Sequence, residues 1–177
     1  MKSHIQKLKQ LEACTEAVEF AKQFNDIQET LENTERGDWI LWLAINLKVN
    51  KRKLTLAKAL CAETVIHLME DERSIKAVEV AKQYGYGNST DVELHNAADA
   101  AADATYVANA AYAAADAAYV ANAANAAAYA TAIDAANATA IDAANAAYAA
   151  KKENQYKTAK IALSILRNEI IENFKKL

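Results

Sequence analysis

Residues capable of catalysis or metal binding are scattered along this chain of 177 residues. Its three histidines, His4, His67 and His95, lie far apart, and none belongs to an HExxH motif or accompanies a CxxC pair. A zinc site needs ligands at short, characteristic spacings. The sequence therefore predicts no metal site, no cofactor and no catalytic residues.

Two further motifs give little reason to expect catalysis. Asp71 and Glu72 are adjacent rather than one helical turn apart, so a helix cap formed by Asp71 is favoured over a general acid–base pair. The segment Gly85-Tyr86-Gly87 lacks both the flanking strand and the lysine that a phosphate-binding loop needs. Without a candidate nucleophile or base, we expect a protein that is not an enzyme.

Side chains suited to recognising another protein are concentrated in the second half of the chain. From residue 83 to residue 150 there is no Lys or Arg, and seven residues are acidic. Phosphate contacts need Lys and Arg, so this half is not expected to bind nucleic acid directly, whereas a basic protein partner would be tolerated. The candidate protein-binding residues are Asp99, Asp103, Asn109, Tyr112, Asp116 and Tyr119.

Four of these residues, Asn109, Tyr112, Asp116 and Tyr119, share one face over a short stretch of helix. Two interpretations of this face stay open. It is either the solvated polar edge of a packed alanine bundle, which we favour over a small-ligand site, or a surface that recognises another protein. Tyrosine suits the second interpretation because it gives a large contact area at a low cost in conformational entropy.

The elements that must position these residues are helices. Proline is absent, the chain has three glycines, and 32 of the 54 residues from 97 to 150 are alanine, the strongest helix former. A single helix of that length would be about 80 Å long, so it must fold back or project as a rod. The expected fold is all-α: a multi-helix bundle with short N-terminal helices and a closely packed alanine-rich helical hairpin or three-helix block.

The first half is expected to form a helical region over residues 1–88 around a tryptophan-rich core helix. Residues 3–33 suggest two or three short amphipathic helices. Gly37 is predicted to end a helix with a positive φ and Asp38 to cap the next one. That next helix is apolar on nearly every face and must be surrounded by protein. The expected centre of the core is Trp39, Leu41, Trp42, Leu43 and Ile45.

Further helix boundaries are marked by capping residues. Asn50 is predicted to cap a long helix whose first turn is basic, at Lys51, Arg52 and Lys53. Cations oppose the dipole at a helix N-terminus, so this cluster is either solvated, which is favoured, or held for a partner. The segment from Thr90 to Glu93 matches a capping box. Residues 89–177 form the alanine-rich region, expected to pack as one domain with the first.

Tandem repeats occur within the alanine-rich region. A segment of 13 residues repeats from 102 to 127, and TAIDAANA occurs twice from Thr131. On a helix, repeats of 13 and 8 residues drift by about 140° and about 80°, so they cannot present one flat row of identical groups. This geometry argues against an ice-binding helix.

The two cysteines and the apolar segments indicate where the protein resides. Cys14 and Cys61 lie in apolar helical patterns, which favours buried free thiols over a disulfide or a reactive pair. No signal-like segment opens the chain, and its apolar stretches are too short or too rich in alanine to span a bilayer. A cytoplasmic protein is expected.

Three strings in the first half carry a resemblance to a known family: EACTEAVEFAKQF, ERGDWILWLAINL, and LAKALCAETVIHLMEDERSIKAVEVAKQYGYG. With the alanine-rich tail, they resemble the immunity proteins of the "immunity protein five-like" type found in bacteria and their phages. The turn at Gly37-Asp38-Trp39 is the most specific part of the resemblance. It implies an all-helical cytoplasmic protein that neutralises a protein target by binding, and it supplies no catalytic residues.

The expected function is therefore that of a binding protein that inhibits a macromolecular target. The target would be a toxin or, if a phage encodes the chain, a component of host defence such as a CRISPR nuclease. A target with a basic nucleic-acid groove would suit the acidic half. A self-assembling alanine-rich scaffold and a small-ligand sequestering protein are the alternatives, and homo-oligomerisation stays open.

Overall fold

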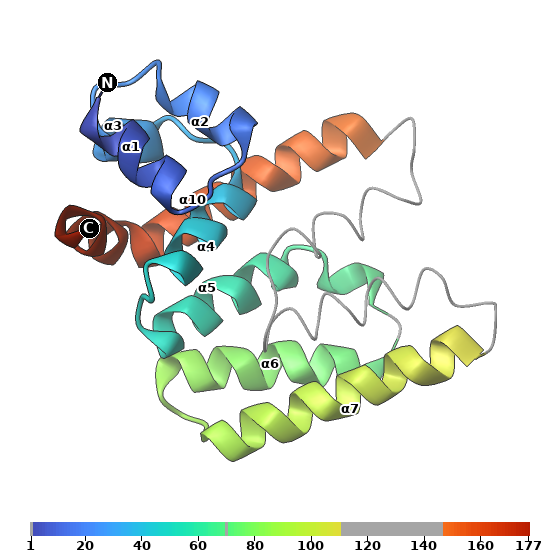
Figure 1. Ribbon diagram of the computed structural model, residues 1–177. Helices are drawn as coiled ribbons and strands as arrows, with labels where there is room; N and C mark the ends of the chain where they lie inside the picture. Colours follow the sequence, from blue (N-terminus) through green and yellow to red (C-terminus); the bar gives the residue numbers. More distant parts are fainter. Residues whose placement is uncertain (1, 70, 111–146) are drawn as a thin grey trace.

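The computed structural model describes residues 2–69, 71–110 and 147–177. Within these ranges every regular element is a helix, which confirms the predicted all-α fold (Figure 1). None of these helices combines the length and the apolar character that crossing a lipid bilayer requires. Residues 111–146, which contain much of the predicted alanine-rich block, lie outside the described ranges.

Three short helices open the chain, as the sequence predicts: α1 (Ser3–Gln10), α2 (Thr15–Ala21) and α3 (Ile27–Glu32). Short helices depend on packing rather than on intrinsic propensity. Each one buries apolar side chains in a common core, among them Ile5, Leu8, Val18 and Leu31.

The first core is completed by two helices from opposite ends of the chain, α4 (Gly37–Asn46) and α10 (Ala147–Lys176). They lie side by side and run in the same direction, with Asn173 donating from α10 to the carbonyl oxygen of Leu47 just after α4 (Figure 1). Leu166 and Ile170 of α10 are fully buried in this core. The C-terminal helix is therefore part of the core that the N-terminal helices form.

The predicted centre of this core is partly wrong. Leu41 and Leu43 are buried, whereas Trp39 and Trp42 are partly exposed and Ile45 is 39% exposed. A helix that is apolar on all faces gives no signal about which side faces its neighbours. Here α10 covers the side of α4 that carries Leu41 and leaves Ile45 in solvent.

Gly37 and Asp38 act differently from the prediction. Gly37 has no positive φ and is the first residue of α4, where it lies so close to α10 that a Cβ atom would stand 2.8 Å from the carbonyl carbon of Thr158. Asp38 does not cap α4 but accepts hydrogen bonds from the Arg36 guanidinium. The glycine is required for close approach between two helices rather than for a turn.

A second core forms on the other side of α5 (Lys51–Glu63). It contains α5, the short 3-10 helix η1 (Ile66–Leu68), α6 (Glu72–Tyr86) and α7 (Asp91–Ala110). Its interior is mostly alanine with Val78, Leu94 and Tyr84. Consecutive helices run in opposite directions and stack in the order α5, α6, α7 (Figure 1). Because small side chains dominate, the helices approach closely, and a Cβ at Gly85 would meet Leu56 Cβ at 2.5 Å.

The predicted caps of this half are present. The side chain of Asn50 accepts from the backbone N–H groups of Arg52 and Lys53, and that of Asp71 accepts from Arg73. Thr90 and Glu93 form the reciprocal capping box, with distances of 3.2 Å and 2.8 Å. These interactions involve neighbours in sequence, so they could be predicted from sequence alone.

The basic first turn of α5 is neither merely solvated nor free for a partner. Lys51 pairs with Asp91 at the start of α7 and Lys53 pairs with Glu169 of α10 at 3.1 Å. Arg52 donates to the carbonyl oxygens of Tyr84 and Ser89 at 2.6 and 3.2 Å. These cations compensate the unfavourable dipole interaction by joining α5 to the helices on both of its sides.

The two cysteines are free, as predicted, but only Cys61 is buried, whereas Cys14 is exposed. Cys14 precedes the first residue of α2, at a bend where its side chain is not covered. The Cys61 thiol donates to the carbonyl oxygen of Thr158 at 3.7 Å, and burial raises the pKa of this thiol to about 12.

This difference predicts a thiol-labelling pattern. In the folded protein near neutral pH, Cys14 should react rapidly with Ellman's reagent and Cys61 should not, because the thiolate is the reacting form and burial disfavours it. In denaturant both thiols should react. The Cys14→Ser variant should lose the fast phase, and a fast phase that persists in this variant would contradict the burial of Cys61.

Candidate functional site

The six predicted protein-binding residues are only partly placed by the structure. Asp99 is exposed on α7, with its Oδ2 atom 3.3 Å from Nε2 of His95. The backbones of Asp103 and Asn109 belong to the same helix. Tyr112, Asp116 and Tyr119 lie outside the described residues. Of the predicted surface, the structure therefore describes one exposed carboxylate and its helix.

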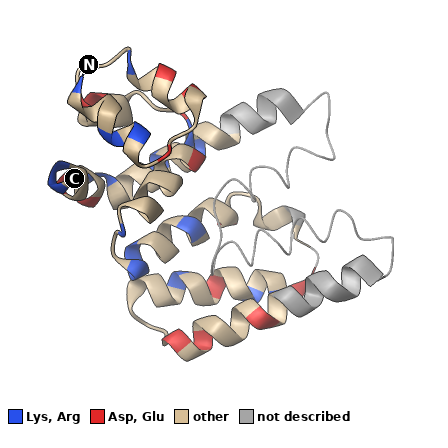
Figure 2. Cartoon of the chain, viewed as in Figure 1, with Lys and Arg blue, Asp and Glu red and all other residues tan. Residues whose placement is uncertain are grey.

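Other acidic residues of α7 have roles within the fold (Figure 2). Asp91 accepts from Lys51 and from the Tyr84 hydroxyl at 3.0 Å, and these hydrogen bonds hold the pKa of its carboxyl below its usual value. Glu93 has a lowered pKa because it accepts from the backbone and side chain of Thr90. Asp99 lies later in the same helix and takes part neither in the contacts of Asp91 nor in the capping box of Glu93.

An apolar hollow between the N-terminal helices was not predicted from the sequence. It lies among α1, α2, α3 and α4 and has an empty volume of about 400 Å³ when its open mouth is included. Its walls are almost entirely apolar and include Ala13, Ala17, Phe20, Thr34, Trp39 and Trp42. Both tryptophans are only partly buried, so their indoles form part of an accessible wall.

The aromatic wall of this hollow is built from contacts between helices. The rings of Phe20 in α2 and Trp39 in α4 have centroids 5.6 Å apart at 56°, and Phe20 also contacts Phe24 at 5.1 Å. Tilted ring pairs at these distances are favourable. The Arg36 guanidinium lies 4.6 Å from the Trp39 ring centroid, where a cation–π interaction adds to the packing.

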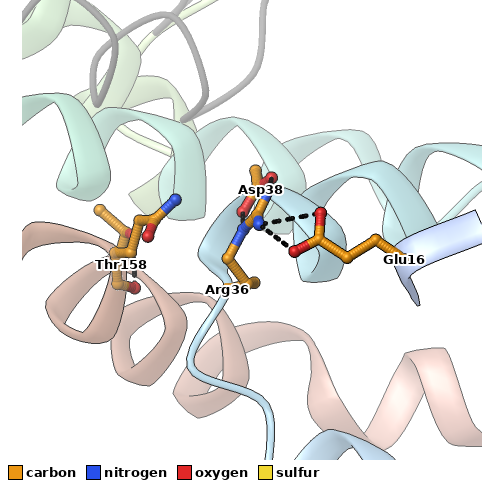
Figure 3. A network of polar contacts seen from close by, with 5 residues as sticks. Glu16, Arg36, Asp38 and Thr158 are labelled. Atoms are coloured by element: carbon orange, nitrogen blue, oxygen red, sulfur yellow. Dashed lines mark hydrogen bonds and ion pairs between the residues drawn. The ribbon is translucent and has the colours of Figure 1, made fainter. Parts of the chain in front are cut away.

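Arg36 is held in this place by two carboxylates (Figure 3). Its Nε and Nη2 atoms donate to the two oxygens of Asp38 at 2.8 and 2.6 Å, and Nη1 lies 3.4 Å from Glu16 of α2. The hydrogen bond to Asp38 is the main reason that the pKa of Arg36 is raised. A two-point contact fixes the plane of the guanidinium, so this network positions the cation against Trp39.

The surroundings of the hollow carry an excess of acidic residues. Residues 11–47, which include α2, α3 and α4, contain eight acidic and two basic residues, and residues 2–47 contain eight acidic and five basic ones. Glu12, Glu16 and Glu35 are exposed, and each is next in sequence to a residue that lines the hollow. This excess of acids could have been counted from the sequence, whereas the hollow depends on how four helices meet.

A strip of buried polar groups follows the contact between α5 and α10. The Thr64 hydroxyl donates to Oδ1 of Asn154 at 2.8 Å, and Nδ2 of Asn154 has no hydrogen-bond partner. Lys58 is buried, and desolvation lowers the pKa of its amine. Among the described residues, no group of three or more His, Cys, Asp and Glu side chains converges as metal ligands would.

Comparisons of the chain with family models, with curated proteins and with solved structures find no match. The resemblance to immunity proteins therefore stays a prediction that rests on the three strings in the first half.

Proposed function

We propose that this chain is a binding protein that inhibits another macromolecule by covering a basic surface on it. The observation that carries the proposal is the distribution of exposed charge. The helix α7 contains acidic residues (Figure 2) and no Lys or Arg, and acidic residues outnumber basic ones in the segment that forms most of the hollow of α1–α4. Such a protein presents a negative potential to its surroundings, which favours encounter with a positively charged partner.

Ion pairs restrict which charges a partner would meet. Arg36, Lys51, Lys53, Lys82 and Arg167 each form an ion pair with an acidic residue. A charge that is neutralised by its neighbour contributes little to the field at a distance. The remaining exposed carboxylates, Asp99 on α7 among them, are therefore the groups that a partner would meet.

The resemblance to immunity proteins is consistent with this proposal and suggests the kind of target. Immunity proteins neutralise their targets by binding, so the partner would be a toxin or a host-defence nuclease. Proteins that hold nucleic acid do so with Lys and Arg, which provide the complementary positive surface. A protein that covers such a groove would inhibit by excluding the nucleic acid.

Affinity capture with the full chain tests the proposal. We expect a bacterial lysate to yield a basic partner that binds less tightly as salt is raised, since screening weakens exposed charge pairs. The variant Asp99→Lys combined with Asp103→Lys and Asp116→Lys should bind this partner about tenfold more weakly or worse. Glu172→Lys, an exposed substitution on α10, is the matched control for Asp99→Lys and should have little effect.

Two results would contradict the proposal. One is the absence of any captured partner at low and at high salt. The other is a partner whose affinity is the same for the wild-type chain and for the variant with three reversed charges, provided that both show the same helical circular dichroism.

A further inference from the structure

We infer that the apolar hollow of α1–α4 receives a single aromatic or large aliphatic side chain from a basic segment of the partner protein. This inference rests on the proposed function and adds to it a second contact surface, remote from Asp99, with a defined occupant. Four features of the hollow support it: its size, its aromatic wall, the fixed position of Arg36 and the charge around its mouth.

The size of the hollow favours one side chain over a whole small molecule. Sites for drug-sized ligands usually measure about 300 to 1,000 Å³ and enclose most of the ligand. The value of about 400 Å³ found here counts the open mouth, so the enclosed part is smaller. The enclosed part offers room for one side chain at most, and the rest of the segment that carries it would stay outside.

The wall of the hollow is already in place to receive such a group. Trp39 contacts both Phe20 and Arg36, at ring-centroid distances of 5.6 and 4.6 Å. The Asp38 carboxylate prevents the guanidinium from moving away from the indole. Hot spots of protein interfaces are apolar anchors that enter pockets of this kind, because little conformational entropy is lost when the pocket is already formed.

The charged residues around the mouth of the hollow indicate which residues should flank the side chain that enters it. In the segment 11–47 both basic residues are paired, Lys22 with Glu19 at 2.5 Å and Arg36 with Asp38. Two lysines near the start of the chain, Lys2 and Lys7, donate to backbone carbonyl oxygens of Phe24 and Phe174. Exposed Glu12 and Glu35 are left to face an incoming segment, with Lys9 the exposed cation on the α1 side, so Lys or Arg is expected next to the anchor on the side of these acids.

Selection from a display library of short random peptides on the immobilised full chain tests the inference. Enriched peptides should carry one aromatic or large aliphatic residue flanked by Lys or Arg. Synthetic versions with alanine in place of this residue should bind at least about tenfold more weakly. The Ala17→Leu variant, which fills the hollow, should lose binding to a similar extent, and the matched control Ala100→Leu on α7 should not.

A second variant keeps the test decisive if Ala17→Leu fails to fold. Glu12→Lys combined with Glu35→Lys alters exposed side chains that lie outside the Arg36 network, and it should weaken the selected peptides and flatten their salt dependence. Three results would overturn the inference: no enrichment of any peptide, enriched peptides without basic flanks, or binding that a folded Ala17→Leu chain retains.

The outcome separates this inference from the proposed function. If the peptides fail but the lysate partner is captured and depends on Asp99, the inference is wrong and the proposed function stands. If peptides are selected and no lysate partner is captured, the hollow binds basic anchored segments and the proposed function is wrong. Failure of both experiments rejects both.

Discussion

Replacing Leu166 by alanine is expected to lower the free energy of unfolding by about 2 to 5 kcal/mol. Leu166 is fully buried in the middle of α10, in the core that this helix shares with the N-terminal helices. Alanine would leave a cavity there, because the surrounding helices can collapse into it only in part. A loss of this size is a large part of the total stability of a small domain, about 5 to 15 kcal/mol.

Denaturant unfolding followed by circular dichroism measures this effect. Tyr156→Ala on the same helix is the matched control, since Tyr156 is 43% exposed and Nζ of Lys160 lies 4.4 Å from its ring centroid. An exposed substitution of this kind should change stability by about 0.5 kcal/mol or less. Equal midpoints for the two variants would show that α10 is not anchored in the core at Leu166.

Gly37→Ala is expected to cost about 1 to 3 kcal/mol or more, although it adds a single methyl group to a helix. The added Cβ would lie 2.8 Å from both Cβ and the carbonyl carbon of Thr158. Since two of the atoms it meets cannot rotate away, α4 and α10 must separate. Away from such a contact, the same change inside a helix would normally stabilise it.

A comparison of two glycines tests this explanation. At Gly87, φ is 89° and nothing lies within 4 Å of an added Cβ, so Gly87→Ala should cost about 1 to 2 kcal/mol through backbone strain alone. Thr158→Ala removes the side-chain hydroxyl that also crowds Gly37 and should recover part of the loss in Gly37→Ala. It should recover nothing in Gly87→Ala, and the same recovery in both would refute the steric explanation.

Features that depend on neighbours in sequence could be predicted well. Asn50, Asp71 and the pair Thr90 and Glu93 form the expected caps, because a cap joins a side chain to an amide two or three residues away. The all-α fold followed from composition, since alanine without proline leaves few other choices. These predictions needed no knowledge of which helices pack together.

Features that depend on helix packing could not be predicted in the same way. A glycine before a helix indicates either a positive φ or a close approach, and only the position of Thr158 decides for Gly37. Ile45 lies on a helix that is apolar on all faces. Its exposure therefore depends on which part of α4 is covered by α10. The partners of Lys51 and Lys53 are 40 and 116 residues away, beyond the reach of any local pattern.

The two candidate sites differ in the same way, since one depends on local sequence and the other on helix packing. The exposure of Asp99 agrees with a solvated polar face on α7, which periodicity can predict. The hollow arises where four helices meet imperfectly, and no single segment encodes it. The excess of acidic residues from 11 to 47 was nevertheless visible in the sequence, and it identifies the region in which such a hollow could bind a basic partner.

The position of α10 determines the order in which the chain can reach its native state. Lys7 contacts the carbonyl oxygen of Phe174, 167 residues further along, so during synthesis the core of the first helices cannot be completed until α10 has left the ribosome. Until then their apolar faces have no permanent cover, and closing so long a loop slows folding. The first helices are thus stabilised late, and damage to the last turns of α10 would destabilise helices more than a hundred residues earlier in the sequence.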